Sequence, residues 1–213
     1  MKKRSQAVRD PAPRKRAGTD SAKALVDAVV IAAGDLLIEQ GPTFTTNDVA
    51  KRAGVSIGSL YQYFPNKEAI LAEATRRVNE SLQGQLTEIV EGPGDPPSKV
   101  NAAIDLACSA RFGDVELRRA LFMHVPRTWS HTAIAASETT IIELLSELAA
   151  DLVAWRCARG LPVPPEGHDG AAVAFFMVRG AIQGALLHRP ELLEENRLAD
   201  MIRPHLHAMF AGS

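Results

Sequence analysis

Residues 45–64, TTNDVAKRAGVSIGSLYQYF, constrain the fold of this chain more than any other stretch. Thr45 followed by Asp48 is a capping pair that favours the start of a helix. Gly54 suits the positive φ that often ends a helix, and Ser56 can cap the next one. Two helices this short are not stable alone, so they must pack across each other. The spacing therefore predicts a helix-turn-helix.

The second of these helices has one face of small and hydrogen-bonding groups. Leu60 and Phe64, four residues apart, form its inner side. The outer positions are Ile57, Gly58, Ser59, Tyr61, Gln62 and Tyr63. Small and hydrogen-bonding side chains on a short helix fit the major groove of DNA. We therefore expect this face to contact DNA.

The segment TTNDVAKRAGVSIGSLYQYFPNKEAIL resembles the signature of the TetR/AcrR family of bacterial one-component transcriptional regulators. The preceding VVIAAGDLLIEQG is similar to the first helix of that family, with its double Ala and its terminal Gly. The resemblance is specific over about residues 21–77 and fades after them. It implies an all-α homodimer, with an N-terminal three-helix domain that binds DNA and a C-terminal helical domain for effector binding and dimerisation.

The resemblance further implies which side chains contact DNA. Phosphate contacts are implied for Tyr61, Tyr63 and Lys67. Ile57 offers only apolar contact, for instance to a thymine methyl, so base recognition would depend on Ser59 and Gln62. Lys67 also lies at a helix start, where the dipole attracts anions, so a cation there fits a phosphate site. The complete set expected at the DNA is Thr45, Thr46, Asn47, Ser56, Ile57, Gly58, Ser59, Tyr61, Gln62, Tyr63 and Lys67.

Composition favours a helical protein outside the membrane. Of the 213 residues 46% are apolar and only 5% aromatic, and Ala and Leu are abundant. No apolar run is long enough to cross a bilayer and no signal peptide is visible, so we expect a cytoplasmic protein without a membrane partner. Cys108 and Cys157 lack metal spacing, which predicts buried or half-buried thiols in a reducing cytosol.

The charges are distributed unevenly. Residues 1–77 carry 13 Lys and Arg against 8 Asp and Glu, a net charge of +5, whereas the whole chain has a net charge of −1. A basic end is expected where only that end meets a polyanion. Residues 1–16 alone contribute +6, so most of the excess lies in a flexible basic arm over residues 1–18. A solvated tail and a DNA-contacting arm are equally open interpretations of it.

We expect three regions: the arm 1–18, a DNA-binding domain 19–77, and a ligand-binding and dimerisation domain 78–213. The segment EGPGDPP, residues 91–97, is the clearest linker, and we expect the domain boundary to lie near it. Helices are predicted at 19–40, 45–54, 56–64, 66–86 or beyond, 98–111, 114–124, 131–159, 170–188 and from 196 onward, the last kinked at Pro204.

Two sites are predicted in the second domain. The resemblance implies an effector pocket lined by large apolar and polar side chains. For each single residue, packing in the core is the commoner role. The candidates are Arg111, Phe112, Met123, His124, Trp129, Phe176 and Arg179. The helix at 170–188 is apolar nearly all round, and the stripe of the final helix has no evident partner within the chain. A two-fold interface of these helices is therefore expected, unless both belong to one ordinary core. Its candidates are Gly180, Gly184, Leu187, Ile202 and Leu206.

Other functions fit less well. Gly54–Gly58 matches G-x-S-x-G, but that nucleophile elbow needs a strand before the Ser, and here a helix precedes it. The histidine pairs 124/131 and 205/207 do not share a helix face, so no metal or cofactor is predicted. A DNA-binding protein without an effector is the main alternative. We predict a non-enzymatic transcriptional regulator, most simply a repressor released from a palindromic operator by a small-molecule effector.

Overall fold

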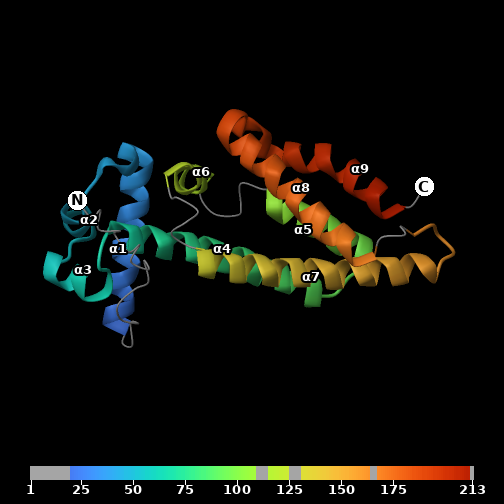
Figure 1. Cartoon of the computed structure of the whole chain (residues 1–213), viewed down its shortest axis with the longest axis horizontal. Helices are drawn as coiled ribbons and strands as arrows, with labels where there is room; N and C mark the ends of the chain where they lie inside the picture. The colour runs from blue at the N-terminus through green and yellow to red at the C-terminus, as the bar shows by residue number, and fades with distance from the viewer. Residues whose placement is uncertain (1–19, 109–114, 125–130, 164–166, 212–213) are drawn as a thin grey trace, which may run out of the picture. The chain divides into compact units, whose positions relative to one another are not determined.

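The computed structural model describes residues 20–108, 115–124, 131–163 and 167–211. Every regular element in these ranges is a helix, which confirms the predicted all-α class (Figure 1). The helices are α1 Asp20–Gln40, η1 Gly41–Thr43, α2 Thr46–Ala53, α3 Ile57–Tyr63, α4 Lys67–Glu91, α5 Pro96–Cys108, α6 Val115–His124, α7 His131–Cys157, α8 Gly167–His188, η3 Pro190–Asn196 and α9 Arg197–Ala211. None of these helices is long and apolar enough to cross a membrane.

The chain groups into two compact units. The first contains the described parts of residues 1–76 and 120–131, and the second those of 77–119 and 132–213. Helices α4 and α6 therefore contribute residues to both units. The segment 91–97 lies inside the second unit, where it forms the turn between α4 and α5, so it does not separate the two units as we expected. The functional division at residue 77 stays a prediction.

The first unit is built on one face of α1. Apolar residues recur on that face every three or four positions, and they are buried against α2 and α3. The largest fully buried side chains of this unit come from all four of its first helices and their ends: Val29, Leu37, Val49, Leu60, Phe64, Ile70 and Leu71. Burying a side chain of this kind contributes about 1.5–3 kcal/mol, so the two short helices α2 and α3 are held by this core.

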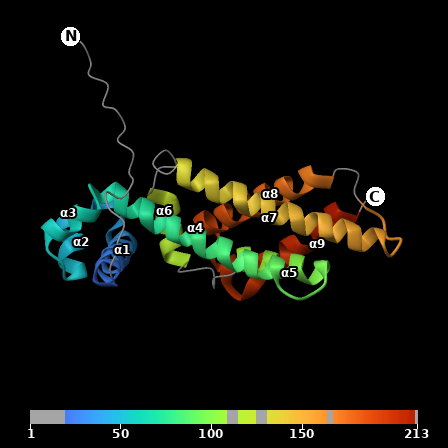
Figure 2. The same cartoon turned by 90° about the horizontal axis from the view of Figure 1, so that it is seen from below.

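The described residues of the second unit form a small hydrophobic cluster at Ala149 and Leu152 and two larger ones. One joins the later part of α4 to α5 and α7 through residues such as Leu86, Ala103 and Leu148, and Figure 2 shows α4 and α7 running alongside each other. The other joins α5, α8, η3 and α9. It contains Leu198 and Leu206 of α9, with Ile202 and Met209 packed against it. The apolar stripe of α9 therefore has an internal partner, and our expectation that it has none was wrong.

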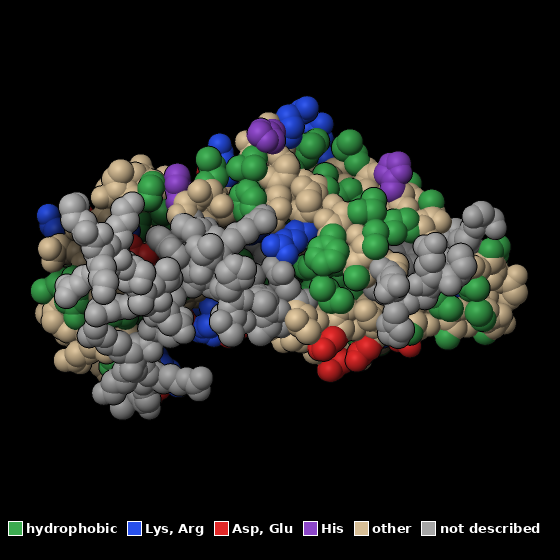
Figure 3. All heavy atoms as spheres, in the orientation of Figure 1, with side chains coloured by type: hydrophobic (Ala, Val, Ile, Leu, Met, Phe, Trp, Pro, Cys, Tyr) green, Lys and Arg blue, Asp and Glu red, His purple; other side chains and the backbone are tan. Residues whose placement is uncertain are grey.

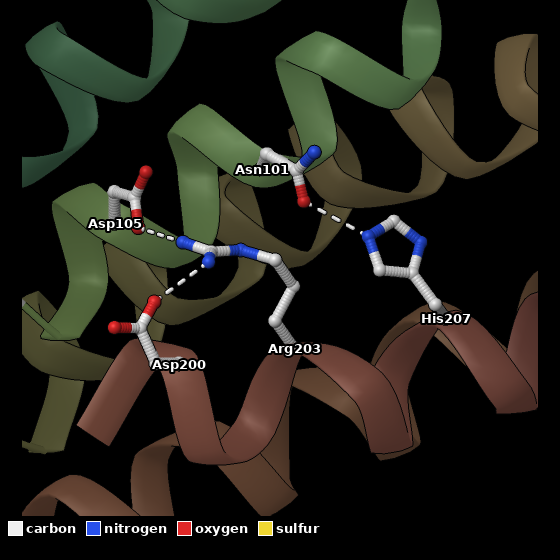
Figure 4. A network of polar contacts seen from close by, with 5 residues as sticks. All are labelled: Asn101, Asp105, Asp200, Arg203 and His207. Atoms are coloured by element: carbon white, nitrogen blue, oxygen red, sulfur yellow. Dashed lines mark hydrogen bonds and ion pairs between the residues drawn. The ribbon is translucent and has the colours of Figure 1, made fainter. Parts of the chain in front are cut away.

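Polar contacts also attach α9 to α5. The guanidinium of Arg203 donates to Asp105 of α5 and, at 2.8 Å, to Asp200 of α9 (Figure 4). Nε2 of His207 lies 2.9 Å from Oδ1 of Asn101, one turn of α5 before Asp105. Arg203, Asp105, His207 and Asn101 are partly buried and join two points on each helix, so they set how α9 lies along α5.

Candidate nucleic-acid interface

Helix α2 begins with the capping box that the sequence predicts. The amide of Asp48 donates to Oγ1 of Thr45 at 3.3 Å, and the amide of Thr45 donates to Oδ2 of Asp48 at 2.7 Å. The hydrogen bonds from the Thr45 hydroxyl and amide lower the pKa of the Asp48 carboxyl. The helix ends at Gly54, whose φ of +68° is the left-handed conformation that glycine adopts at little cost.

Helix α3 follows directly. The hydroxyl of Ser56 accepts from the amide of Ser59 at 3.0 Å, as a helix cap does, and also lies 2.8 Å from the Ser59 hydroxyl. Leu60 and Phe64 are buried against the rest of the first unit. The caps and the buried pair together fix the direction of α3, and the predicted helix-turn-helix is present.

The start of α2 and the middle of α3 meet at the surface. Oγ1 of Thr46 lies 2.9 Å from the hydroxyl of Tyr61, and both side chains are accessible. Asn47 is exposed beside Thr46 in the sequence. The residues of α3 that remain accessible, called the α3 face below, are Ile57, Gly58, Ser59, Tyr61 and Gln62. This surface can offer hydroxyl and carboxamide groups to an external ligand.

Two of the residues predicted at the DNA have other roles in this fold. Tyr63 is only 8% exposed, so it belongs to the core and not to the outer side of α3. Nζ of Lys67 donates to the carbonyls of Pro42, at 2.5 Å, and Phe44, at 3.1 Å, and lies 4.9 Å from the centre of the Phe44 ring. Lys67 therefore holds the connection between α1 and α2. The amide of Ala69 is satisfied by Asn66, which caps α4.

Arg52 of α2 is also engaged within the first unit. Its guanidinium donates to both carboxylate oxygens of Glu39 on α1, at 2.9 and 2.6 Å, and lies 4.0 Å from Asp35. The hydrogen bond from Arg52 lowers the pKa of the Glu39 carboxyl. This planar paired geometry attaches α2 to α1 and directs a cation of the helix-turn-helix toward the protein.

Two comparisons identify the helix-turn-helix region. The model for bacterial regulatory proteins of the tetR family matches residues 30–74. The HTH-type transcriptional regulator EthR of Mycobacterium tuberculosis is 34% identical over 71 residues, which are 32% of this chain and 33% of EthR. Residues 30–74 of this chain are therefore similar to the tetR family of bacterial regulatory proteins. The match to EthR covers only about a third of that relative's length.

Solved structures extend the similarity of fold to most of this chain. NalD, the secondary repressor of the MexAB-OprM multidrug efflux pump in Pseudomonas aeruginosa, is 22% identical, with a TM-score of 0.66 over 90% of this chain and 98% of NalD. SmeT, the repressor of the Stenotrophomonas maltophilia pump SmeDEF, is 22% identical, with a TM-score of 0.65 over 88% of this chain and 91% of SmeT. These structures are similar in fold beyond the segment that the family model matches.

The predicted effector pocket is only partly covered by the structure. Arg111, Phe112 and Trp129 lie outside the described residues. Met123 and Phe176 are 53% and 55% exposed, unlike side chains that line an enclosed cavity. His124 lies beside η1 of the first unit, with Nε2 3.7 Å from the place of a Cβ on Gly41, and Arg179 is half-buried. The pocket therefore stays a prediction.

Sequence reasoning missed a buried cation in the second unit. Arg118 of α6 is only 9% exposed, and burial lowers its pKa to about 10, so it is still charged at neutral pH. Burial also raises the pKa of the Cys108 thiol to about 11, as expected for an inert thiol, whereas Cys157 is exposed and so does not fit our prediction. No periodic signal distinguishes Arg118 from the adjacent Arg119, so the sequence alone could not identify it.

The predicted dimer residues fall into two groups. Leu206 is buried and Ile202 is half-buried, both in the cluster between α5 and α9, so the intrachain core accounts for them. Gly180 and Gly184 are exposed, and a Cβ on either would have no atom within 4 Å, while Leu187 is half-buried. On the same side of α8, Val173, Phe176 and Met177 expose 48%, 55% and 50% of their surface. These three residues with Gly180 and Gly184 are called the α8 face below.

Proposed function

We propose that this chain is a sequence-specific DNA-binding transcriptional regulator in which α3 enters the major groove. The observation that carries this proposal is the accessible α3 face, on a helix whose direction is fixed by two caps and by buried Leu60 and Phe64. Thr46 of α2 lies 2.9 Å from the Tyr61 hydroxyl of that face, and this hydroxyl pair can donate a hydrogen bond to a phosphate oxygen. A helix-turn-helix presents its second helix to DNA in this way.

The proposed active species is a homodimer joined through α8. Spacing of i, i+3, i+4, i+7 and i+11 places the α8 face on one side of the helix. Large apolar groups that are half exposed in the isolated chain gain most from burial against a second copy. Figure 3 shows hydrophobic side chains at the surface over α8 and α9. A two-fold axis through this surface would give two recognition helices and hence a palindromic operator.

The proposed regulation is release of a repressor by a small molecule bound in the second unit. Two structures of similar fold support this proposal. NalD and SmeT are repressors of multidrug efflux pumps, and SmeT has been solved as a complex with triclosan. A ligand that binds the DNA-free conformation more tightly shifts the population away from the operator. The alternative is a regulator without an effector. A thermal-shift screen of small hydrophobic molecules separates the two, since only the first predicts stabilisation by a ligand that also lowers operator affinity.

The experiment that tests DNA recognition is selection of duplexes from a random-sequence library by the full-length protein. We expect one enriched sequence with two-fold symmetry, bound at least about a thousandfold more tightly than scrambled DNA at the same salt concentration. Failure to enrich any sequence, with equal affinity for scrambled duplexes, would contradict the proposed function.

A further inference from the structure

Nothing among the described residues requires a glycine at position 58. Gly58 lies in the first turn of α3 and is exposed. Its φ is not positive, and an added Cβ would meet only Oγ of Ser56, at the ordinary contact distance of 3.8 Å. Gly54, by contrast, needs its left-handed φ of +68°. Because glycine weakens a helix relative to alanine, Gly58 costs stability that no contact among the described residues recovers.

Gln62 lies one helical turn after Gly58 and therefore on the same side of α3. It is exposed, and among the described residues its carboxamide takes part in none of the hydrogen bonds that order this surface. The hydroxyls of Ser59 and Tyr61 are each already paired within the chain, with Ser56 and Thr46. Gln62 is thus the side chain on the α3 face whose donor and acceptor are both available to a ligand.

The chemistry of this face favours one kind of base. A Gln carboxamide pairs with N6 and N7 of adenine through one acceptor and one donor, whereas guanine is read by Arg or Lys. Helix α3 contains neither Arg nor Lys, and Lys67 and Arg52 are occupied within the first unit. A carboxamide side chain is short, so the helix backbone must come close to the base edge for this pairing to form.

We propose that Gly58 is the point at which the α3 backbone approaches the base edges most closely, and that this approach lets Gln62 read an adenine in the major groove. The assignment depends on the DNA-binding function proposed above and adds to it the identity of a base and a positioning residue. The missing Cβ of Gly58 provides the space, and the carboxamide of Gln62 provides the specificity.

The first test uses Gly58→Ala with Gly84→Ala as a matched control. Gly84 is also an exposed helical glycine, on α4, and a Cβ there would have no atom within 4 Å. We expect both variants to melt at a slightly higher temperature than the wild type, because alanine favours helix. Only Gly58→Ala should bind the selected duplex more weakly, by about tenfold or more. Wild-type affinity of Gly58→Ala, or a lower melting temperature than the wild type, would overturn the assignment.

The second test replaces each adenine of the selected duplex, one at a time, by 7-deazaadenine, which lacks the N7 acceptor. We expect the wild-type protein to lose affinity at one adenine of each half-site, and Gln62→Ala to lose about 5- to 150-fold on the natural duplex. At that adenine, combining 7-deazaadenine with Gln62→Ala should lower the affinity no further than either change alone. A selected half-site whose adenines all tolerate 7-deazaadenine would overturn the assignment while leaving DNA recognition intact. Absence of any selected sequence would overturn both.

Discussion

The α3 face and the α8 face both contain exposed glycines for which the described residues give no steric reason, but their neighbours differ. Gly58 lies among hydroxyl and carboxamide groups, whereas Gly180 and Gly184 lie among half-exposed Val, Phe and Met side chains. A surface with open hydrogen-bonding groups suits base edges and phosphates, which are polar. A surface with large apolar groups suits another protein surface. If both proposals hold, the side chains around such a glycine indicate the class of its partner.

The largest expected effect comes from placing a charge in the α8 face. We expect Gly184→Arg to raise the dimer dissociation constant at least about a thousandfold, because a buried unpaired guanidinium costs several kcal/mol. Sedimentation equilibrium measures this. Gly84→Arg, at an exposed position of α4, should leave the dimer intact. A Gly184→Arg protein that stays dimeric would place the interface elsewhere.

A smaller effect separates the core side of α3 from its outer side. We expect Leu60→Ala to lower the free energy of unfolding by about 2–5 kcal/mol, because it leaves a cavity beneath the helix. Gln62→Ala, two positions later but exposed, should change the unfolding free energy by less than about 0.5 kcal/mol. Urea unfolding followed by circular dichroism compares the two variants. Equal losses would mean that α3 is oriented differently.

Lys67→Ala is expected to reduce stability by about 1–2 kcal/mol, because Nζ holds two carbonyls of the connection between α1 and α2. We expect the dependence of DNA affinity on salt to change little, since the ammonium faces the protein. Unchanged stability together with a salt slope lower by about one unit would instead assign Lys67 to a phosphate. Thermal melts and salt titrations of the same variant distinguish these outcomes.

The smallest effect concerns the cap of α2. Hydrogen bonds from Thr45 lower the pKa of Asp48 in the folded state. Its contribution to stability is therefore present above the unfolded pKa of about 3.9 and is lost as pH falls through the folded pKa. In Asp48→Asn the loss of stability that comes from protonation of Asp48 should disappear. Circular dichroism between pH 6 and pH 2 measures the helix content of the wild type and of Asp48→Asn. Loss of helix at the same pH in both proteins would contradict the assignment.

Sequence reasoning succeeded where the determining interactions are local. The caps Thr45 and Ser56 and the terminator Gly54 act within a few residues, so the helix-turn-helix could be predicted in detail. The burial of Tyr63 and the carbonyl partners of Lys67 could not be predicted, because their surroundings come from segments distant in sequence. Lys67 finds its carbonyl partners 23 and 25 residues away.

The second unit shows the same limit on a larger scale. The final helix could be predicted from its spacing of apolar residues, but its packing partner could not. Arg203 and His207 meet α5 across separations of 98 and 106 residues. An amphipathic stripe indicates that a face is buried and leaves open whether the partner is the same chain or another copy. Only the three-dimensional arrangement assigns α9 to the core and leaves the α8 face exposed.

The most direct test of the two-face account is sedimentation velocity of the full-length protein with a fluorescent selected duplex. We expect the wild type to form a complex of two chains on one duplex, and Gln62→Ala to stay dimeric while losing the duplex. Gly184→Arg should sediment as a monomer and lose the two-chain complex. If Gly184→Arg still forms that complex, or if Gln62→Ala binds the duplex like the wild type, the assignment of DNA to α3 and of dimerisation to α8 is contradicted.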